Sequence, residues 1–528
     1  MIRRQGCVSA GGTAIPDHVQ VRGQESPSQP DWQPLVLALL SLPWLVLWLV
    51  PPVNLDVAAL LQFTERWVGG EQLYVDLVDV NPPLVFLLYA LPVLLARTRG
   101  LGVTAAFNLS LLLFVLLVGR MVWRRLLALA PSRPRLLLMA GFLPFAVAAL
   151  STLMAGQREH LLAVAILPWL FDAASRAQAP LPWRRTVPAA LLAALGLCLK
   201  PHFLAIPLLV EGWLALRRGR HALADAVPWA MGGLFAAYGA LVWLSFPAYL
   251  HEMLPLALGS YASFADMTPL AVLFQDFFRP SLALLLACLP FAFRQGGPVG
   301  SALALAACGA VVGAVAQGKG WPYHYLPADI LIVLLAAWLL GGVLGRLRRP
   351  SGGVSLRFGV AAVLLANGLA IATRVEPWSA WGDPNSPLVQ LASGLRQVAP
   401  HQPVLVLSPE IGPIYPAMAA AETTQAMRFM SLWMLEAAYA QCPASGRRYR
   451  EPAEMSGDER FVFNAVSQDF ARRRPLLLVV DRQTAIPKCD GTFEFDAYFK
   501  RNQEFAAAFA QYRPVRDDGR FRFFTRID

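Results

Sequence analysis

Apolar runs of about 20 residues recur along the first two thirds of the chain, and the short segments between them hold most of its charge. An α-helix needs about that length to cross the hydrocarbon of a bilayer. With 56% hydrophobic and 15% charged residues, the chain is also too apolar for an ordinary soluble protein. The pattern therefore predicts an α-helical polytopic membrane protein.

One apolar run, residues 83–96, is short and contains Pro92, so it fits either a span or a helix at the membrane interface. The positive-inside rule decides between the two, because cytoplasmic loops are rich in Arg and Lys. If this run does not cross, every later arginine cluster falls on the cytoplasmic side. The clusters are Arg120, Arg124, Arg125, Arg133 and Arg135; Arg176, Arg184 and Arg185; Arg217, Arg218 and Arg220; Arg294; and Arg346, Arg348 and Arg349.

Eleven spans are then expected, which gives a membrane domain over residues 34–373 with a first outer loop at 54–101. Residues 1–33 are polar and rich in Pro, Gln and Gly, so we expect a disordered cytoplasmic tail. An odd number of spans places the part after residue 373 outside the cytoplasm. The expected spans are about 34–53, 102–119, 135–154, 160–175, 186–199, 203–216, 225–246, 280–293, 297–316, 326–345 and 355–373.

Residues 374–528 have the alternating pattern of a small soluble α/β domain. It contains Cys442 and Cys489, which can form one disulfide if the domain faces an oxidising compartment. The expected helices are 388–398, 458–473 and 496–512, and the expected strands are 404–407, 476–480 and 521–525.

Polar residues gather at the helix ends that this topology places outside. They are Asp56, Asp76 and Asp79 in the first outer loop; Arg158, Glu159 and His160; Lys200 and His202; and Lys319, Tyr323 and His324. The chain has four lysines among its 45 Lys and Arg residues, and Lys200 and Lys319 are the two in the membrane part. A positive charge at an outer helix end is disfavoured, which makes both lysines functional candidates, although snorkelling side chains would look the same.

The acidic candidates also have structural alternatives. Asp56 follows the first span directly and could act as a catalytic base or as the N-cap of the next helix. Asp79 precedes Pro82 and Pro83, so it fits either a functional role or a turn. Asp76 fits a solvated loop residue, and Arg158 either binds substrate phosphate or pairs with Glu159.

The histidines expected outside raise the question of a metal site. No two of them have a ligand spacing such as His-x3-His, so a divalent metal remains an undecided alternative. A net charge of +11 does not indicate nucleic acid here, because the arginines of the membrane part fall in short loops between helices.

Carboxylates beside Lys and Arg at the boundary of water and lipid suit a substrate with an anionic head and an apolar tail. A polyprenyl-phosphate sugar is such a molecule: the cations would bind its phosphate, and a carboxylate would take a proton from the acceptor hydroxyl. No Gly-rich phosphate loop is present, which argues against a cytoplasmic nucleotide sugar.

The order of these motifs resembles the GT-C membrane glycosyltransferases, over about residues 34–345. The resemblance is to the branch that contains the protein O-mannosyltransferases and the lipid A aminoarabinose transferase. This branch is similar to glycosyltransferase family 39. The motifs are Asp56; Leu73-Tyr74-Val75-Asp76; Asp79-Val80-Asn81-Pro82-Pro83; Gly156-Gln157-Arg158-Glu159-His160; Lys200-Pro201-His202; and Lys319-Gly320-Trp321.

The resemblance implies a bacterial inner-membrane enzyme with a periplasmic C-terminal domain. It would transfer a sugar with inversion from a polyprenyl-phosphate donor to a lipid, glycan or protein acceptor, with Asp56 as base and Asp79 as a second acidic residue. The neutral Asn81 before Pro82 departs from the pattern of relatives, which have an acidic residue before Lys-Pro. A lipid-linked polysaccharide ligase or polymerase and a transporter or flippase remain as alternatives.

Overall fold

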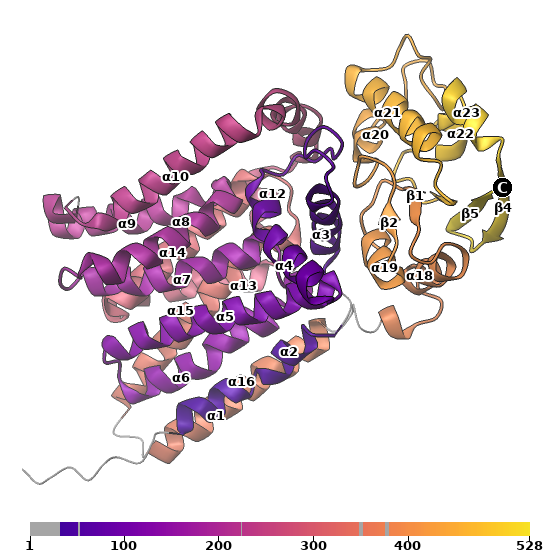
Figure 1. Cartoon of the computed structure of the whole chain (residues 1–528). Coiled ribbons are helices and arrows are strands. Elements are labelled where there is room, and N and C mark those ends of the chain that lie inside the picture. The colour runs from indigo at the N-terminus through magenta and orange to yellow at the C-terminus, as the bar shows by residue number, and fades with distance from the viewer. Residues whose placement is uncertain (1–31, 51–52, 223, 348–351, 375–379, 528) are drawn as a thin grey trace, which may run out of the picture.

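The computed structural model describes residues 32–50, 53–222, 224–347, 352–374 and 380–527, with side chains described over all of these except 352–355 and 373–374. Figure 1 shows a bundle of long helices and, beside one end of it, a smaller part that contains the β-strands and the C-terminus. The expected tail, residues 1–33, lies outside the described residues apart from its last two.

Each expected span contains at least one helix among the described residues. These helices are α1 (Gln33–Leu39), α2 (Leu42–Leu47), α5 (Val103–Ala128), α6 (Arg133–Pro144), α7 (Arg158–Arg176), α8 (Trp183–Leu199), α9 (Ala205–Arg218), α10 (Ala226–Ser245), α13 (Arg279–Gln295), α14 (Gly297–Ala316), α15 (Leu326–Arg346) and α16 (Gly352–Arg374). In the described residues, four stretches are long and apolar enough to cross a membrane by themselves: Val103–Ala128, Ala226–Ser245, Gly297–Ala316 and Pro322–Arg346. The chain therefore has the helices of a membrane protein, and the number of eleven spans stays a prediction.

Three local expectations differ from the structure. The first expected span is broken into α1 and α2, and the run at 135–154 leaves the α-helix at Pro144 and continues as a π turn and a 3-10 turn. A proline lacks the N–H that an uninterrupted helix needs, which accounts for the second break. α5 continues past residue 119 to Ala128, because Arg is a good helix former and charge alone does not end a helix.

Several arginines expected in cytoplasmic loops lie inside helices and are paired with acids. Arg125 Nε donates to Asp172 Oδ2 at 2.9 Å, and Arg185 Nε contacts the other oxygen of the same carboxylate at 3.1 Å. Arg176 donates two hydrogen bonds to Glu211, at 2.8 and 2.9 Å. These pairs hold α5, α7, α8 and α9 together at the end of the bundle away from the strands.

The outer loop contains two helices, α3 (Leu55–Val68) and α4 (Leu84–Arg99), which pack against each other. Short elements complete the same end of the bundle: α11 (Leu254–Leu258), α12 (Pro269–Leu273) and the 3-10 turn Ser260–Phe264. The segment expected to lie at the interface is thus helical, from Leu84 to Arg99.

The C-terminal domain is built on a five-stranded mixed sheet with the order β2-β1-β3-β5-β4. β1 is parallel to β2 and β3, whereas β5 is antiparallel to β3 and β4. The strands are β1 (Pro403–Leu407), β2 (Thr424–Gln425), β3 (Leu477–Asp481), β4 (Tyr512–Asp517) and β5 (Phe521–Arg526). The helices are α18 (Pro387–Val398), α19 (Ile414–Ala421), α20 (Trp433–Ala438), α21 (Gly457–Arg473), α22 (Phe495–Phe499) and α23 (Gln503–Phe509).

This domain agrees with the expected α/β pattern, with one correction. The helix expected at 496–512 is two helices, because Asn502 caps α23 by accepting hydrogen bonds from two backbone N–H groups, and Tyr512 already begins β4. Cys442 and Cys489 form a disulfide.

Helix α3 joins the two parts of the molecule. The Gln62 amide donates to the Thr423 carbonyl at 2.9 Å and accepts from the Gln425 backbone N–H at 2.8 Å. Glu71 contacts both Arg66 of α3 and Arg473 of α21. Burial raises the pKa of Glu71, but the hydrogen bonds from these two arginines outweigh it and bring the pKa to about 2. The C-terminal domain therefore sits directly on the helix that begins beside Asp56.

Candidate functional site

Asp56 lies in the first turn of α3 but does not cap the helix. The cap is Asn54, whose side-chain oxygen accepts from the backbone N–H groups of Asp56 and Val57 at 3.0 and 3.2 Å. The half-buried Asp56 carboxylate instead accepts a hydrogen bond of 2.6 Å from Gln157 Nε2. The structure thus removes the capping alternative for Asp56 and leaves its carboxylate available for chemistry.

Gln157 connects the start of α3 to the start of α7. Its amide also donates to Asn54 Oδ1 at 2.9 Å, and Asn54 Nδ2 donates to the Leu153 carbonyl at 2.8 Å. Gly156 precedes Gln157 with a φ of +82°, and a Cβ there would lie 2.6 Å from the Phe107 ring. Glycine is therefore required where the chain turns to bring Gln157 to Asp56.

His160, another of the polar candidates, is held by backbone groups in this arrangement. It is fully buried, and its Nδ1 accepts from the Gly156 N–H at 3.0 Å. Its Nε2 lies 3.1 Å from the Val147 carbonyl, to which it donates when Nδ1 is the acceptor. Both ring nitrogens are occupied by the backbone.

Arg158 and Glu159 do not pair with each other, although they are neighbours in the sequence. Glu159 is fully buried, and its Oε1 lies 3.0 Å from Lys200 Nζ. Neither oxygen of Glu159 has a hydrogen bond of good geometry within the described residues, so the contact with Lys200 is an ion pair only. Arg158 is 6% exposed, and its guanidinium makes no hydrogen bond or ion pair with any described residue. The charge of Arg158 is opposed through space by the carboxylates of Glu159 and Asp56, and its Nε has no hydrogen-bond partner among the described residues.

The two lysines lie near each other and against aromatic rings. Lys200 Nζ is 3.4 Å from Gln317 Oε1 and 5.7 Å from the centre of the Tyr323 ring. Lys319 Nζ is 3.2 Å from the centre of the Tyr261 ring and 4.8 Å from that of Trp321. Burial lowers the pKa of Lys319, and the charges of Lys200 and Arg158 lower it further, to about 7. Lys319 is thus only partly charged at neutral pH, beside the cations Lys200 and Arg158.

The two acidic residues proposed for catalysis both have raised pKa values. Burial raises the pKa of Asp56 most, with Arg158 opposing it and Glu159 adding to it. Burial likewise raises the pKa of Asp79 to about 6. Asp79 Oδ1 accepts from the Asn81 backbone N–H at 2.7 Å, so it also makes the turn that its position before two prolines suggested.

The remaining candidates lie at the edge of this cluster or outside it. Asp76 accepts from the Gln72 backbone N–H at 2.9 Å and so stabilises its own loop. His202 is exposed, whereas His324 is buried with a ring Nδ1 that has no hydrogen-bond partner in the described residues. Within the part of the chain that the structure describes, no group of three or more His, Cys, Asp or Glu residues could hold a metal ion.

Sequence reasoning missed Gln157, Gln317 and Tyr261 as members of the cluster. An uncharged amide and a single tyrosine carry no distinctive pattern, and each reaches the site only through contacts with residues far away in the chain. Gln157, for example, stands 101 residues from Asp56. Its place in a motif that contains Arg158 was the one available signal.

An apolar cavity of about 300 Å³ lies next to the charged cluster, between α4, α5, α7 and α8. Tyr89 lines it and donates through its hydroxyl to the Gly156 carbonyl at 2.8 Å. Leu199, which directly precedes Lys200, lines it as well. The charged groups and a cavity suited to an apolar chain are therefore adjacent. No known protein family matches this chain, and a search of curated proteins finds no similar protein either.

Proposed function

We propose that this protein is a membrane glycosyltransferase, which moves a sugar with inversion from a polyprenyl-phosphate donor to an acceptor outside the cytoplasm. The observation that carries the proposal is the buried Arg158, whose Nε has no hydrogen-bond partner among the described residues and whose charge acts on Asp56 in the same cluster. The eleven-span topology, with the C-terminal domain in the periplasm of a bacterial cell, is part of this proposal. The disulfide between Cys442 and Cys489 supports an oxidising location for that domain.

The donor phosphate would bind to Arg158, Lys200 and Lys319. A phosphate there would accept a hydrogen bond from Arg158 Nε, which has no partner among the described residues, and charge-assisted hydrogen bonds to phosphate are among the strongest in proteins. The first isoprene units would enter the apolar cavity lined by Tyr89 and Leu199. Glu159 would hold Lys200 in position through their ion pair.

Asp56 would act as the general base. The acceptor hydroxyl would give its proton to the Asp56 carboxylate while its oxygen forms a bond to the anomeric carbon of the sugar. The bond between that carbon and the phosphate oxygen would break, and the polyprenyl phosphate would leave as an anion stabilised by the cations. The hydrogen bond from Gln157 orients the carboxylate, and the raised pKa of Asp56 makes it a better proton acceptor.

The test is transfer from a synthetic polyprenyl-phosphate sugar by the purified protein in lipid nanodiscs, with cell-envelope extract as the source of acceptor. Asp56→Asn keeps the size of the side chain and an oxygen for Gln157, but it cannot take the proton. We expect transfer to fall by about 10²–10⁴-fold, with thermal stability nearly unchanged.

Asp76→Asn is the matched control, because it removes the same charge from the same loop and is expected to keep nearly full transfer. Substantial turnover by a folded Asp56→Asn variant would exclude Asp56 as the base. A ligase or polymerase would join glycans that are already lipid-linked, and a flippase would move the donor across the membrane without a new product. The product of the assay separates these two alternatives from the transferase.

A further inference from the structure

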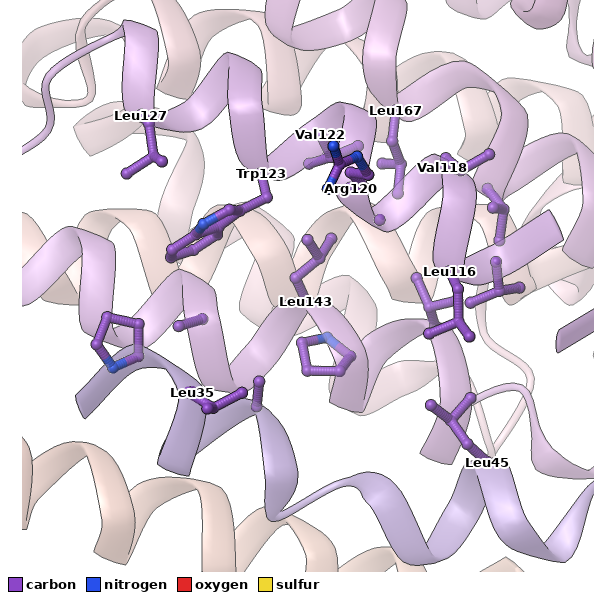
Figure 2. A pocket seen from close by; sticks show the side chains of 18 of the residues that line it. Leu35, Leu45, Leu116, Val118, Arg120, Val122, Trp123, Leu127, Leu143 and Leu167 are labelled. Carbon is purple, nitrogen blue, oxygen red and sulfur yellow. The ribbon is translucent and has the colours of Figure 1, made fainter. Parts of the chain in front are cut away.

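A groove of about 610 Å³ lies between α1, α2, α5, α6 and α7, and none of the residues of the charged cluster lines it. Figure 2 shows that Leu35 and Leu45 border it on one side, while Leu116 and Trp123 of α5 border it on the other, with Leu143 between them. Arg120 is the only charged residue among those that line the groove. The groove is therefore an apolar channel with a single positive charge.

The groove exists because neighbouring helices pack in two separate sets. α1 packs against α6 and α16, whereas α5 packs mainly against α4 and α7. The side chains of α1, α2 and α5 leave a space between these sets that no described residue fills. A space of this kind loses van der Waals contacts unless an apolar chain occupies it, and in a bilayer lipid chains are the available molecules.

If α5 crosses the bilayer as expected, Arg120 would lie near the depth of the lipid headgroups. α5 begins at Val103 beside the C-terminal domain, and a rise of 1.5 Å per residue puts Arg120 about 25 Å further along the helix. The hydrocarbon of a bilayer is about 30 Å thick, so Arg120 is near the membrane face away from that domain. Its side chain is exposed and makes no hydrogen bond or ion pair with a described residue. Arg125, one turn later, is by contrast paired with Asp172.

We propose that this groove binds one anionic glycerophospholipid from the leaflet away from the C-terminal domain. The phosphate would pair with Arg120, and one acyl chain would lie between α5 and the helices α1 and α2. The lipid would complete the packing of the bundle, a role that does not depend on the proposed transferase activity.

The experiment measures binding of phosphatidylglycerol and phosphatidylcholine with identical acyl chains to the detergent-purified protein by native mass spectrometry. We expect one tight site that prefers phosphatidylglycerol. Arg120→Gln should weaken phosphatidylglycerol binding by roughly 10- to 100-fold, the range for losing a charge-assisted hydrogen bond. Arg124→Gln is the matched control, because Arg124 is exposed on the same helix and does not line the groove.

A second variant tests the place of the acyl chain. Gly119 lines the groove, and a Cβ added to it would have no heavy atom within 4 Å. Gly119→Leu should therefore fill the groove without a clash and weaken both lipids. The proposal would be overturned if Arg120→Gln bound phosphatidylglycerol as the parent protein does, or if the parent protein bound the two lipids equally. Full lipid binding by a folded Gly119→Leu variant would overturn it as well. Displacement of the lipid by an equal amount of polyprenyl phosphate would assign the groove to the donor instead and would also overturn it.

Discussion

The ion pair between Lys200 and Glu159 allows a quantitative test of how the charged cluster is held together. The Glu159 side chain is fully buried and that of Lys200 is 13% exposed, with 3.0 Å between Nζ and Oε1. Removing one partner of such a pair leaves an uncompensated buried charge, which costs about 3–5 kcal/mol. Removing both charges together avoids that cost. Lys200→Met and Glu159→Gln should therefore each destabilise the protein, and the double variant should be far more stable than their sum predicts.

The two single changes should also differ in size. After Lys200→Met, the Glu159 carboxylate has the charge of Arg158 near it but no hydrogen-bond partner within the described residues. After Glu159→Gln, Lys200 still has Gln317 Oε1 at 3.4 Å and the Tyr323 ring. We therefore expect Lys200→Met to cost more free energy of unfolding than Glu159→Gln.

The assay is equilibrium unfolding in mixed detergent micelles, with helical content followed by circular dichroism for the four proteins of a double-mutant cycle. We expect a coupling energy of about 2–4 kcal/mol for this pair. The exposed pair of Arg279 and Asp276, 2.9 Å apart, is the control within the same chain and should show a coupling of at most about 1 kcal/mol. Additive effects of Lys200→Met and Glu159→Gln, within about 0.5 kcal/mol, would refute the reasoning.

Three further predictions concern other parts of the molecule. Burial raises the pKa of Asp79 to about 6, so the ionised carboxylate destabilises the folded protein above that pH. Asp79→Asn removes the charge and keeps an oxygen for the Asn81 N–H. It should raise the melting temperature at pH 8 and raise it less at pH 5. An equal gain at both pH values would contradict this. The disulfide joins residues 47 apart, so replacing Cys442 and Cys489 with Ser should lower the stability of the C-terminal domain by about 2–4 kcal/mol in chemical unfolding, and an unchanged unfolding midpoint would count against it. A reporter that is active only in the cytoplasm, fused after Asp528, should be silent in cells, and a positive signal would reverse the expected topology.

Local patterns in the sequence predict most of the secondary structure. The length and apolar character of the runs place a helix at every expected span, and short runs of β-forming residues find β1, β3 and β5. Elements with weak local signals were missed: β2 has two residues, and most of β4 is exposed. α5 extends beyond the expected span of 102–119, because positively charged residues mark a membrane boundary but do not end a helix.

The sequence by itself determined which residues were candidates. A charge at the end of an apolar helix costs free energy near the hydrocarbon, so such residues are easily recognised in the sequence. What each residue does was decided only by the tertiary structure. Asn54 rather than Asp56 caps α3, Lys200 rather than Arg158 pairs with Glu159, and the backbone occupies both nitrogens of His160. The pairing of Glu159 with Lys200, like the contact between Asp56 and Gln157, joins residues that are distant in the chain. Such partners depend on how whole helices pack, and no pattern within a short stretch of sequence contains that information.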